Sequence, residues 1–239
     1  MKITWLGHSA FLAQGAGATV LIDPFFTGNP LFSESFLQQI SSVDAIILTH
    51  GHGDHLGDAV TLAGKFKAKI FALFEVCAYL GTKGVTHCEP MNIGGTVAIN
   101  DRVSVSLVNA VHSASVVEDG KIIYLGQAAG AVLMSDEGCL YHAGDTDVFS
   151  DMALIQRIYK PDVALLPIGG RFTMSPQTAA LACNDFLDVK TAIPMHYGTF
   201  PIIGNAPQEF VNLLDKAEGV ILAPGESFSF GVAFSTKKP

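Results

Sequence analysis

The chain has 239 residues, of which 49% are hydrophobic and only 15% are charged. A typical soluble domain carries about 25% charged residues, so this composition excludes intrinsic disorder and allows a large core. Lys and Arg number 14 against 22 Asp and Glu, and the resulting net charge of −8 argues against a generic binder of nucleic acid.

The first segment that needs interpretation is residues 3–22, the longest run without a charged side chain. It is long enough to span a bilayer, but His8, Ser9, Gln14 and several glycines make it a poor lipid-facing helix. The same residues interrupt the apolar region that a signal peptide would need. We therefore predict a hairpin with its turn at residues 15–17, no membrane partner and a cytoplasmic protein.

The elements that follow are short and lie in one continuous domain. No linker, repeat or charge block divides the sequence, so we predict a single domain over residues 1–239. Alternating and apolar runs predict strands; proline at a first helical position and apolar residues at helical spacing predict helices. The predicted strands are 2–13, 19–23, 44–49, 96–99, 103–108, 122–127, 131–134, 139–142, 163–166, 191–195, 220–222 and 227–230, and the predicted helices are 58–66, 149–159, 175–187 and one that begins at Pro207.

Two strand-rich regions with helices between them predict sheets that pack on each other and are covered by helices. The apolar loops at residues 24–36 and 172–203 predict a pocket suited to a small substrate. The four cysteines, at positions 77, 88, 139 and 183, form no CxxC pair and lie beside no cluster of metal-binding residue types. They are therefore predicted to be reduced, buried thiols of a reducing compartment.

The segment that carries chemistry is residues 49–55, Thr-His-Gly-His-Gly-Asp-His. It follows a buried strand and precedes a helix. In a tight loop with glycines, His50 and His52 can face one cation, while Asp54 and His55 face a neighbouring point. Imidazole and carboxylate suit Zn²⁺, Mn²⁺ or Fe²⁺. A solvated turn is the alternative, but such a turn does not need three imidazoles.

Three later strands end in residues that can complete such a site. These residues are His112, Asp145 and His196. Ligands at strand ends converge on one edge of a sheet, and one carboxylate among imidazoles can bridge two cations about 3.5–4 Å apart. Each residue alone could be structural, but together with the loop they predict a two-metal site.

This pattern resembles the metallo-β-lactamase superfamily, whose signature is H-x-H-x-D-H followed by a distant His, Asp and His. The resemblance implies an α/β fold of the four-layer αβ/βα sandwich type. It also implies that one metal is bound by His50, His52 and His112, that the second is bound by Asp54, His55 and His196, and that Asp145 bridges them.

Further stretches resemble one branch of this superfamily, the small prokaryotic metal-dependent hydrolases. More distantly, they resemble the bacterial L-ascorbate 6-phosphate lactonase and the N-acyl-phosphatidylethanolamine phospholipase D. No cysteine stands at a ligand position, which argues against an antibiotic-hydrolysing lactamase. The stretches are Gly7-His8-Ser9, Ile22-Asp23-Pro24-Phe25, Met91-Asn92-Ile93-Gly94-Gly95, His112-Ser113, His142-Ala143-Gly144-Asp145-Thr146, Phe172-Thr173-Met174 and Pro194-Met195-His196-Tyr197.

We therefore predict a metal-dependent hydrolase with two divalent metal ions, Zn²⁺ in first place and Mn²⁺ or Fe²⁺ as alternatives. A hydroxide held by both metals would attack a small, anionic ester, lactone or phosphodiester. Asp54 would orient this hydroxide, and His8 would protonate the leaving group. We expect a small-molecule substrate and no nucleic acid, and we leave homo-oligomerisation open. The alternatives are a nuclease-type phosphodiesterase, a di-iron redox protein and a non-catalytic metal-binding protein on the same fold.

Some residues near these motifs allow two interpretations. His8 is either a hydrogen-bonded core histidine of a strand or the proton donor. Asp23 is predicted to fix its loop or to orient a metal-binding histidine. Arg171 could bind an anionic substrate or form a surface salt bridge, and the pair at residues 169–170 is predicted to be a turn. The two remaining histidines, His87 and His142, are predicted to be structural.

Overall fold

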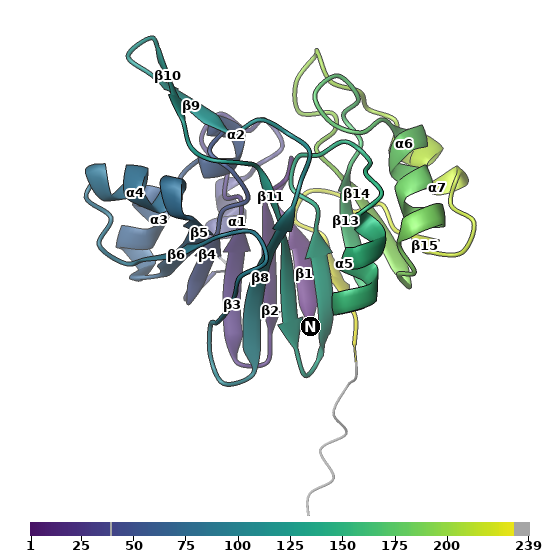
Figure 1. Ribbon diagram of the computed structural model, residues 1–239, viewed down its shortest axis with the longest axis horizontal. Helices are drawn as coiled ribbons and strands as arrows, with labels where there is room; N and C mark the ends of the chain where they lie inside the picture. The colour runs from purple at the N-terminus through teal and green to yellow at the C-terminus, as the bar shows by residue number, and fades with distance from the viewer. Residues whose placement is uncertain (39, 232–239) are drawn as a thin grey trace, which may run out of the picture.

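Two seven-stranded sheets form the core of the computed structural model, which describes residues 1–38 and 40–231 (Figure 1). The strand order of the first sheet is β16-β1-β2-β3-β4-β5-β6, and that of the second is β15-β14-β13-β12-β11-β8-β7. The first sheet comprises β1 (Lys2–Trp5), β2 (Phe11–Gly15), β3 (Ala18–Ile22), β4 (Ala45–Ile47), β5 (Lys69–Leu73), β6 (Cys88–Met91) and β16 (Ser227–Ser229). The second comprises β7 (Thr96–Ala98), β8 (Val103–Asn109), β11 (Ala129–Ser135), β12 (Gly138–His142), β13 (Val163–Pro167), β14 (Thr191–Met195) and β15 (Glu218–Gly219).

The central strands are parallel and buried on both faces. All residues of β4, β13 and β14 are buried, which explains their continuous apolar sequences. The strands from β3 to β6 pair in parallel, and so do those from β12 to β15. The carboxyl ends of these strands therefore lie together at one edge of each sheet.

Helices cover the outer faces of both sheets. In Figure 1, α3 and α4 flank the first sheet on the left, and α5, α6 and α7 flank the second on the right. This arrangement confirms the predicted four-layer α/β sandwich. The helices are α1 (Glu34–Gln38), α2 (Gly53–Leu56), α3 (Ala59–Phe66), α4 (Phe74–Thr82), α5 (Met152–Tyr159), α6 (Pro176–Leu181), the π-helical turn Ala182–Phe186 and α7 (Pro207–Asn212).

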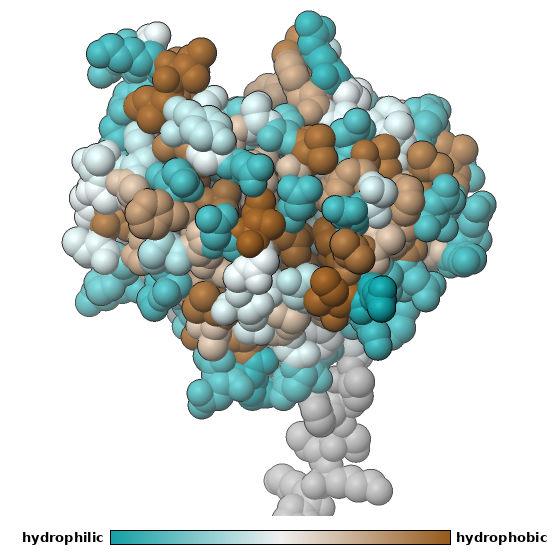
Figure 2. Space-filling view, viewed as in Figure 1, coloured by the Kyte–Doolittle hydropathy of each residue, from teal (hydrophilic) through white to brown (hydrophobic). Residues whose placement is uncertain are grey.

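A separate hairpin, β9 (Ser115–Glu118) and β10 (Lys121–Tyr124), extends beyond the sheets at the upper left of Figure 1. Brown, apolar side chains gather there in Figure 2. Val117 and Ile122 oppose each other across the hairpin, with exposed fractions of 69% and 78%. In the part of the chain that the structure describes, no helix is long and apolar enough to cross a membrane.

Several predicted elements differ from the observed ones. Residues 2–13 form two antiparallel strands rather than one, because the chain reverses at residues 7–9. His8 therefore lies in a turn, with φ of 55°, and not in a strand. The predicted helix 175–187 continues beyond α6 only as a π-helical turn, and the predicted strand 220–222 is replaced by β15 two residues earlier. The elements at α1, β5, α4 and β6 were not predicted, since their short apolar runs have no clear period.

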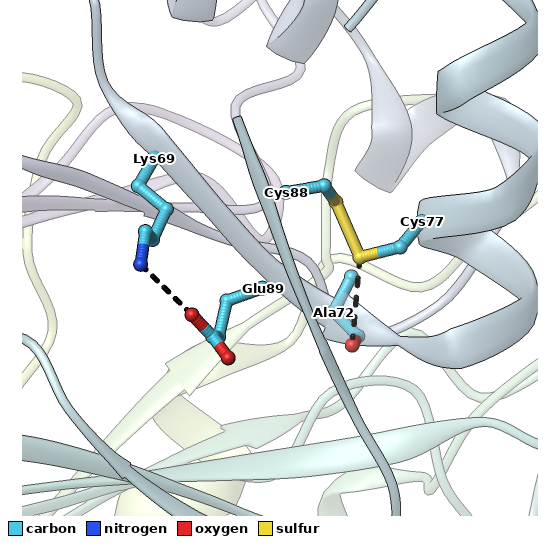
Figure 3. The surroundings of a disulfide bond; sticks show 5 residues. All are labelled: Lys69, Ala72, Cys77, Cys88 and Glu89. Carbon is cyan, nitrogen blue, oxygen red and sulfur yellow. Dashed lines mark hydrogen bonds and ion pairs between the residues drawn. A yellow bond between two sulfur atoms is a disulfide. The ribbon is translucent and has the colours of Figure 1, made fainter. Parts of the chain in front are cut away.

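The prediction of four reduced thiols is wrong for one pair. Cys77 of α4 and Cys88 at the start of β6 form a disulfide, with their Cα atoms 5.7 Å apart (Figure 3). Helix α4 reverses the chain so that β6 returns beside it, and spacing in the sequence does not report this contact. Cys139 and Cys183 are free, and burial raises the pKa of their thiols to about 12 and about 11.

We expect reduction of this disulfide to lower the free energy of unfolding. A disulfide that closes a loop with a sequence separation of 11 residues restricts the unfolded chain and contributes about 3 kcal/mol. Urea unfolding with and without reductant measures this contribution, and Cys139→Ser is the control because it leaves the disulfide intact. Four titratable thiols in the denatured, unreduced chain would contradict the assignment.

Candidate metal centre

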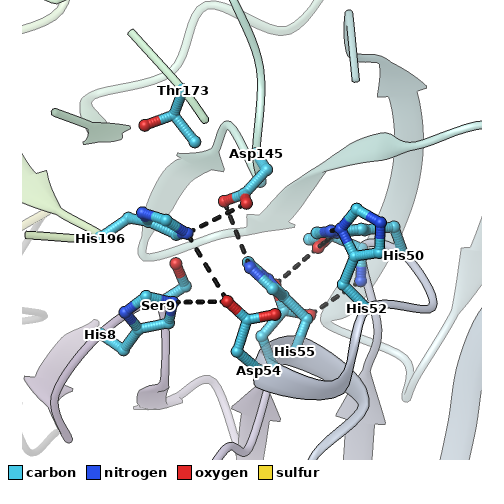
Figure 4. A network of polar contacts seen from close by, with 12 residues as sticks. His8, Ser9, His50, His52, Asp54, His55, Asp145, Thr173 and His196 are labelled. Carbon is cyan, nitrogen blue, oxygen red and sulfur yellow. Dashed lines mark hydrogen bonds and ion pairs between the residues drawn. The ribbon is translucent and has the colours of Figure 1, made fainter. Parts of the chain in front are cut away.

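The predicted ligands all lie at the edge where the carboxyl ends of the central strands meet. Strand β4 leads into the loop that carries His50 and His52, and then into α2 with Asp54 and His55. The second sheet supplies the remaining three residues, which follow β8, β12 and β14: His112, Asp145 and His196. The structure thus brings together residues from two sheets and four places in the chain (Figure 4).

The first group of predicted ligands consists of three imidazoles. The Nδ1 atom of His52 lies 3.0 Å from Nε2 of His50 and 3.3 Å from Nε2 of His112. Three ring nitrogens therefore converge on one point. In a neutral imidazole each nitrogen carries one proton or one lone pair, so three of them form one N–H···N pair and leave the third nitrogen without a partner. A cation among the three nitrogens removes this conflict.

The second group contains Asp54, His55 and His196, together with His8. Each of these four residues offers a ligand atom within 4.8 Å of the others. The Oδ2 atom of Asp54 is 3.1 Å from Nε2 of His8 and 3.8 Å from Nε2 of His196. His8 was predicted to lie outside the ligand set, and the structure places its ring beside that set.

Asp145 lies between the two groups. Its carboxylate oxygens are 3.2 Å from Nε2 of His55, 3.0 Å from Nε2 of His196 and 3.6 Å from Nε2 of His112. It therefore contacts one imidazole of the first group and two of the second. This is the position that a carboxylate shared by two cations would take.

The donor atoms fit a metal. Although they are close to one another, Nε2 of His55, Oδ1 of Asp145 and Nε2 of His196 are buried without a hydrogen-bond partner among the described residues. A buried polar atom without a partner is costly, and native structures contain few of them. Divalent cations coordinated by these atoms would satisfy all three.

Asp23 orients two of the histidines from behind. Its Oδ2 accepts hydrogen bonds from Nδ1 of His55 at 2.7 Å and from Oγ1 of Thr49 at 2.6 Å. Because the Thr49 hydroxyl donates to Asp23, its oxygen accepts from Nδ1 of His50 at 3.0 Å. These hydrogen bonds place a proton on Nδ1 of both imidazoles, so that Nε2 of each ring faces the other predicted ligands. Asp23 thus has the position predicted for a residue that orients a histidine.

Comparisons with known proteins agree with this geometry. The family model described as a beta-lactamase superfamily domain matches residues 18–197. The chain belongs to the metallo-β-lactamase superfamily. A UPF0173 metal-dependent hydrolase of Sinorhizobium medicae is 49% identical over 227 residues, which cover 94% of this chain and 97% of that protein. One from Methanopyrus kandleri is 47% identical over 232 residues, covering 95% and 99%.

A solved structure supports the same assignment. Igni18, a metallo hydrolase from the archaeon Ignicoccus hospitalis, superimposes with a TM-score of 0.84 at 36% identity over 96% of this chain and 98% of that one. The protein described here is therefore a metal-dependent hydrolase. The resemblance inferred from the histidine motif is confirmed at the level of family and fold.

The protonation states of the site suit metal binding. Burial lowers the pKa values of His50, His52 and His112, so these imidazoles are neutral. Burial opposes ionisation of Asp145, but its interactions with His196 and His55 hold its pKa well below the ordinary range. His55 is the exception: despite its burial, Asp145 and Asp23 raise its pKa well above the ordinary value. A cation that binds to Nε2 of His55 must therefore displace a proton.

Two threonines near the site had no predicted role. Thr49 begins the histidine motif, and its hydroxyl group links Asp23 to His50. Thr199 contacts Nδ1 of His8 at 2.8 Å. These two residues are separated by 191 positions, so nothing local in the sequence indicates the contact.

The remaining histidines and the predicted turn at residues 169–170 lie around the centre or away from it. His142 is structural: its Nε2 donates to the carbonyl oxygen of Ser9 at 2.9 Å, and its Nδ1 accepts from the amide of Gly144. His87 is exposed and lies beside α3. Gly169 belongs to a turn, and a Cβ atom there would come within 2.5 Å of the carbonyl oxygen of His196.

We expect Asp23→Asn to weaken metal binding about 10–100-fold. A carboxylate accepts hydrogen bonds through both oxygens, whereas the NH2 group of an amide cannot accept one. The variant therefore holds Nδ1 of His55 and the Thr49 hydroxyl less well. Calorimetric titration of the metal-free protein with Zn²⁺ measures the change. The matched control is Asp58→Asn, since Asp58 accepts from the amides of Phe26 and Thr27 but contacts no predicted ligand. Equal affinities of Asp23→Asn and the parent would contradict the orienting role.

We also expect His142→Gln to reduce the loss of stability in acid. Burial lowers the pKa of His142 from its ordinary value of 6.5, so the folded state keeps the ring neutral where the unfolded chain protonates it. This contribution to stability is complete above pH 6.5 and is lost as the pH falls below it. Urea unfolding of the metal-free parent and variant between pH 7.5 and 5 measures how the free energy of unfolding changes with pH. Parallel curves would show that His142 does not contribute to the loss of stability in acid.

Proposed function

We propose that the protein binds two divalent cations and hydrolyses a small anionic ester, lactone or phosphodiester. The observation that carries this proposal is the meeting of two ligand groups at one carboxylate. His50, His52 and His112 would hold the first metal, and Asp54, His55 and His196 the second. Asp145 would be shared, because it contacts imidazoles of both groups.

We favour Zn²⁺ for both positions. The ligands are imidazole nitrogens and carboxylate oxygens without a thiolate, which zinc accepts in catalytic sites. Mn²⁺ and Fe²⁺ accept the same ligands and are therefore the alternatives to be tested. When bound, such cations supply a nucleophile at neutral pH and an electrophile that polarises the attacked group.

The charge of the site supports an anionic substrate. Two divalent cations carry four positive charges, against two negative charges from Asp54 and Asp145, while most of the imidazoles are neutral. The centre therefore remains positive even though the chain as a whole has a net charge of −8. Such a centre attracts anions locally, whatever the overall charge.

An aromatic wall beside the second group supports a small substrate. The rings of Phe25 and Phe200 lie 5.7 Å and 5.5 Å from the ring of His8, and 6.2 Å from each other. Both belong to the two apolar loops that were predicted to line the pocket. Their rings limit the access of water and of large polymers to this side of the centre.

His8 is arranged to donate a proton toward the centre. Burial lowers its pKa to about 4, so its ring is neutral near pH 7. Asp54 can only accept, and hence the single proton of His8 lies on Nε2, which is 3.1 Å from Oδ2 of Asp54. Nδ1 then accepts from the hydroxyl of Thr199 at 2.8 Å. To protonate a leaving group, His8 must first take up a proton and act as an imidazolium. Asp54 favours that form, because its hydrogen bond and its charge oppose the effect of burial on the pKa of His8.

We expect His8→Ala to retain the metal content and to lose about 10²–10⁴-fold in kcat. The loss should shrink for substrates with good leaving groups, since these depart without a proton. Asp54→Ala should lose both metal affinity and activity, because it removes a ligand. If His8→Ala strips the metal, His8 is a ligand; if it lowers only the free energy of unfolding, His8 is a core residue.

The proposal as a whole is tested by metal analysis coupled to a substrate screen. We expect about two transition-metal ions per reconstituted chain and turnover of at least one class among lactones, phosphodiesters and thioesters. One ion per chain at saturating metal would mean that Asp145 is not shared. Cleavage of structured RNA without turnover of small molecules would favour the nuclease, and native iron with consumption of oxygen would favour the redox protein.

A further inference from the structure

A cavity of about 420 Å³ borders the metal centre on the side of residues 170–178. Its walls include Val111, which directly precedes His112, and Asp147, which lies two positions after Asp145. Thr173 also lines the cavity, and Figure 4 shows its side chain near Asp145 and His196. The cavity is therefore walled by residues that are next to, or near, two predicted ligands in the chain and by Thr173, which lies beside the centre.

The loop that carries Arg171 is fixed relative to the ligands. The amide of Gly170 donates to the carbonyl oxygen of Met174 at 2.9 Å, which closes the loop into a turn. The amide of Met174 then donates to the carbonyl oxygen of Thr146 at 3.1 Å. Since Thr146 directly follows Asp145, the backbone of Arg171 has a defined position with respect to the shared carboxylate.

Two charged side chains face this cavity, Arg171 and Asp147. Arg102, elsewhere on the surface, is held by Asp136 and Glu137, whereas the guanidinium of Arg171 has no carboxylate within ion-pairing distance among residues 1–38 and 40–231. Its neighbour is the ring of Phe172, 5.7 Å away. One oxygen of Asp147 already accepts from the amide of Val148 at 2.8 Å. The donors of Arg171 are thus available, and Asp147 limits how much negative charge the cavity accepts.

We propose that Arg171 binds a single oxyanion group of the substrate, a carboxylate or a phosphate, at a distance from the bond that is cleaved. This inference rests on the proposed function, because it names the substrate class of the same site. A guanidinium presents a planar fork of donors that matches either oxyanion. The substrate would then have two ends: a reacting group at the metal centre and an anionic tail in the cavity.

The test is a calorimetric titration of the zinc-loaded protein with unreactive ligands of graded length. We use linear dicarboxylates from malonate to adipate and, for each, the mono-amide in which one end is neutral. The parent protein should bind the dicarboxylate of one particular length about tenfold more tightly than the mono-amide of the same length. Only a dicarboxylate of that length reaches both the metal centre and Arg171. Phosphonocarboxylates of matched length form the second series and distinguish a phosphate tail from a carboxylate tail.

Three variants make the assignment specific. Arg171→Gln should lose the tenfold preference, whereas Arg157→Gln should keep it, because Arg157 is an exposed arginine of α5 that does not line the cavity. Asp147→Asn should strengthen binding of the anionic tail by removing a repulsive charge. Circular dichroism checks that each exposed substitution leaves the fold intact.

Equal preference in Arg171→Gln and the parent, or no preference in the parent at any length, would overturn the inference. Weaker binding in Asp147→Asn would also overturn it, since the cavity would then select a cationic tail. These outcomes do not depend on turnover. If the protein hydrolyses none of the screened substrates but shows the preference that depends on Arg171, the proposed function is refuted and the anion site is supported.

Discussion

Hydrogen bonds between the two sheets hold the metal centre together, and the other features of the site depend on them. The amide of His196 in the second sheet donates to the carbonyl oxygen of His8 in the first at 3.0 Å. His142 donates across the same interface to Ser9, and the amide of Ala129 donates to the carbonyl oxygen of Thr49. Each of these bonds lies within a few residues of a predicted ligand. Neither sheet contains a complete ligand set, so their packing determines the distances among the imidazoles.

The backbone at this interface is strained at functional positions. His8, Asp23 and His196 have φ values of 55°, 46° and 55°, in a region that residues other than glycine rarely adopt. Such conformations cost of order 1 kcal/mol or more each and persist only when their surroundings enforce them. Here the buried hydrogen bonds of these residues do so. All three residues lie where the chain turns after a strand, beside the predicted metal centre.

The predicted metal ligands and the loops around them have different roles. The predicted metal ligands, with Asp23 and Thr49 behind them, form a centre that many members of one superfamily could share. The rings of Phe25 and Phe200 and the cavity with Arg171 lie on loops outside the central strands. Loops on a rigid scaffold can change without disturbing the ligands. Substrate choice is therefore expected to reside in these loops rather than in the ligand set.

The sequence by itself determined the family, the sandwich fold and the seven candidate ligands. The three histidines and one aspartate of residues 50–55 have the spacing that metal binding requires. Each distant candidate ligand follows an apolar run that predicts a strand. Strand interiors such as β4 and β13 were recognisable because burial on both faces demands continuous apolar residues. Shorter elements such as α1 and β15 were missed or shifted, because a few residues carry no clear period.

Only the tertiary structure decided the contacts between residues far apart in the chain. The turn at His8, its contacts with Asp54 and Thr199, and the disulfide between Cys77 and Cys88 each join separate elements. The cavity beside Arg171 is likewise built from segments that follow three different strands, β8, β12 and β13. Local periodicity and motif spacing describe what neighbouring residues do. The distance between remote side chains depends on how the sheets pack, and that packing is a property of the whole core.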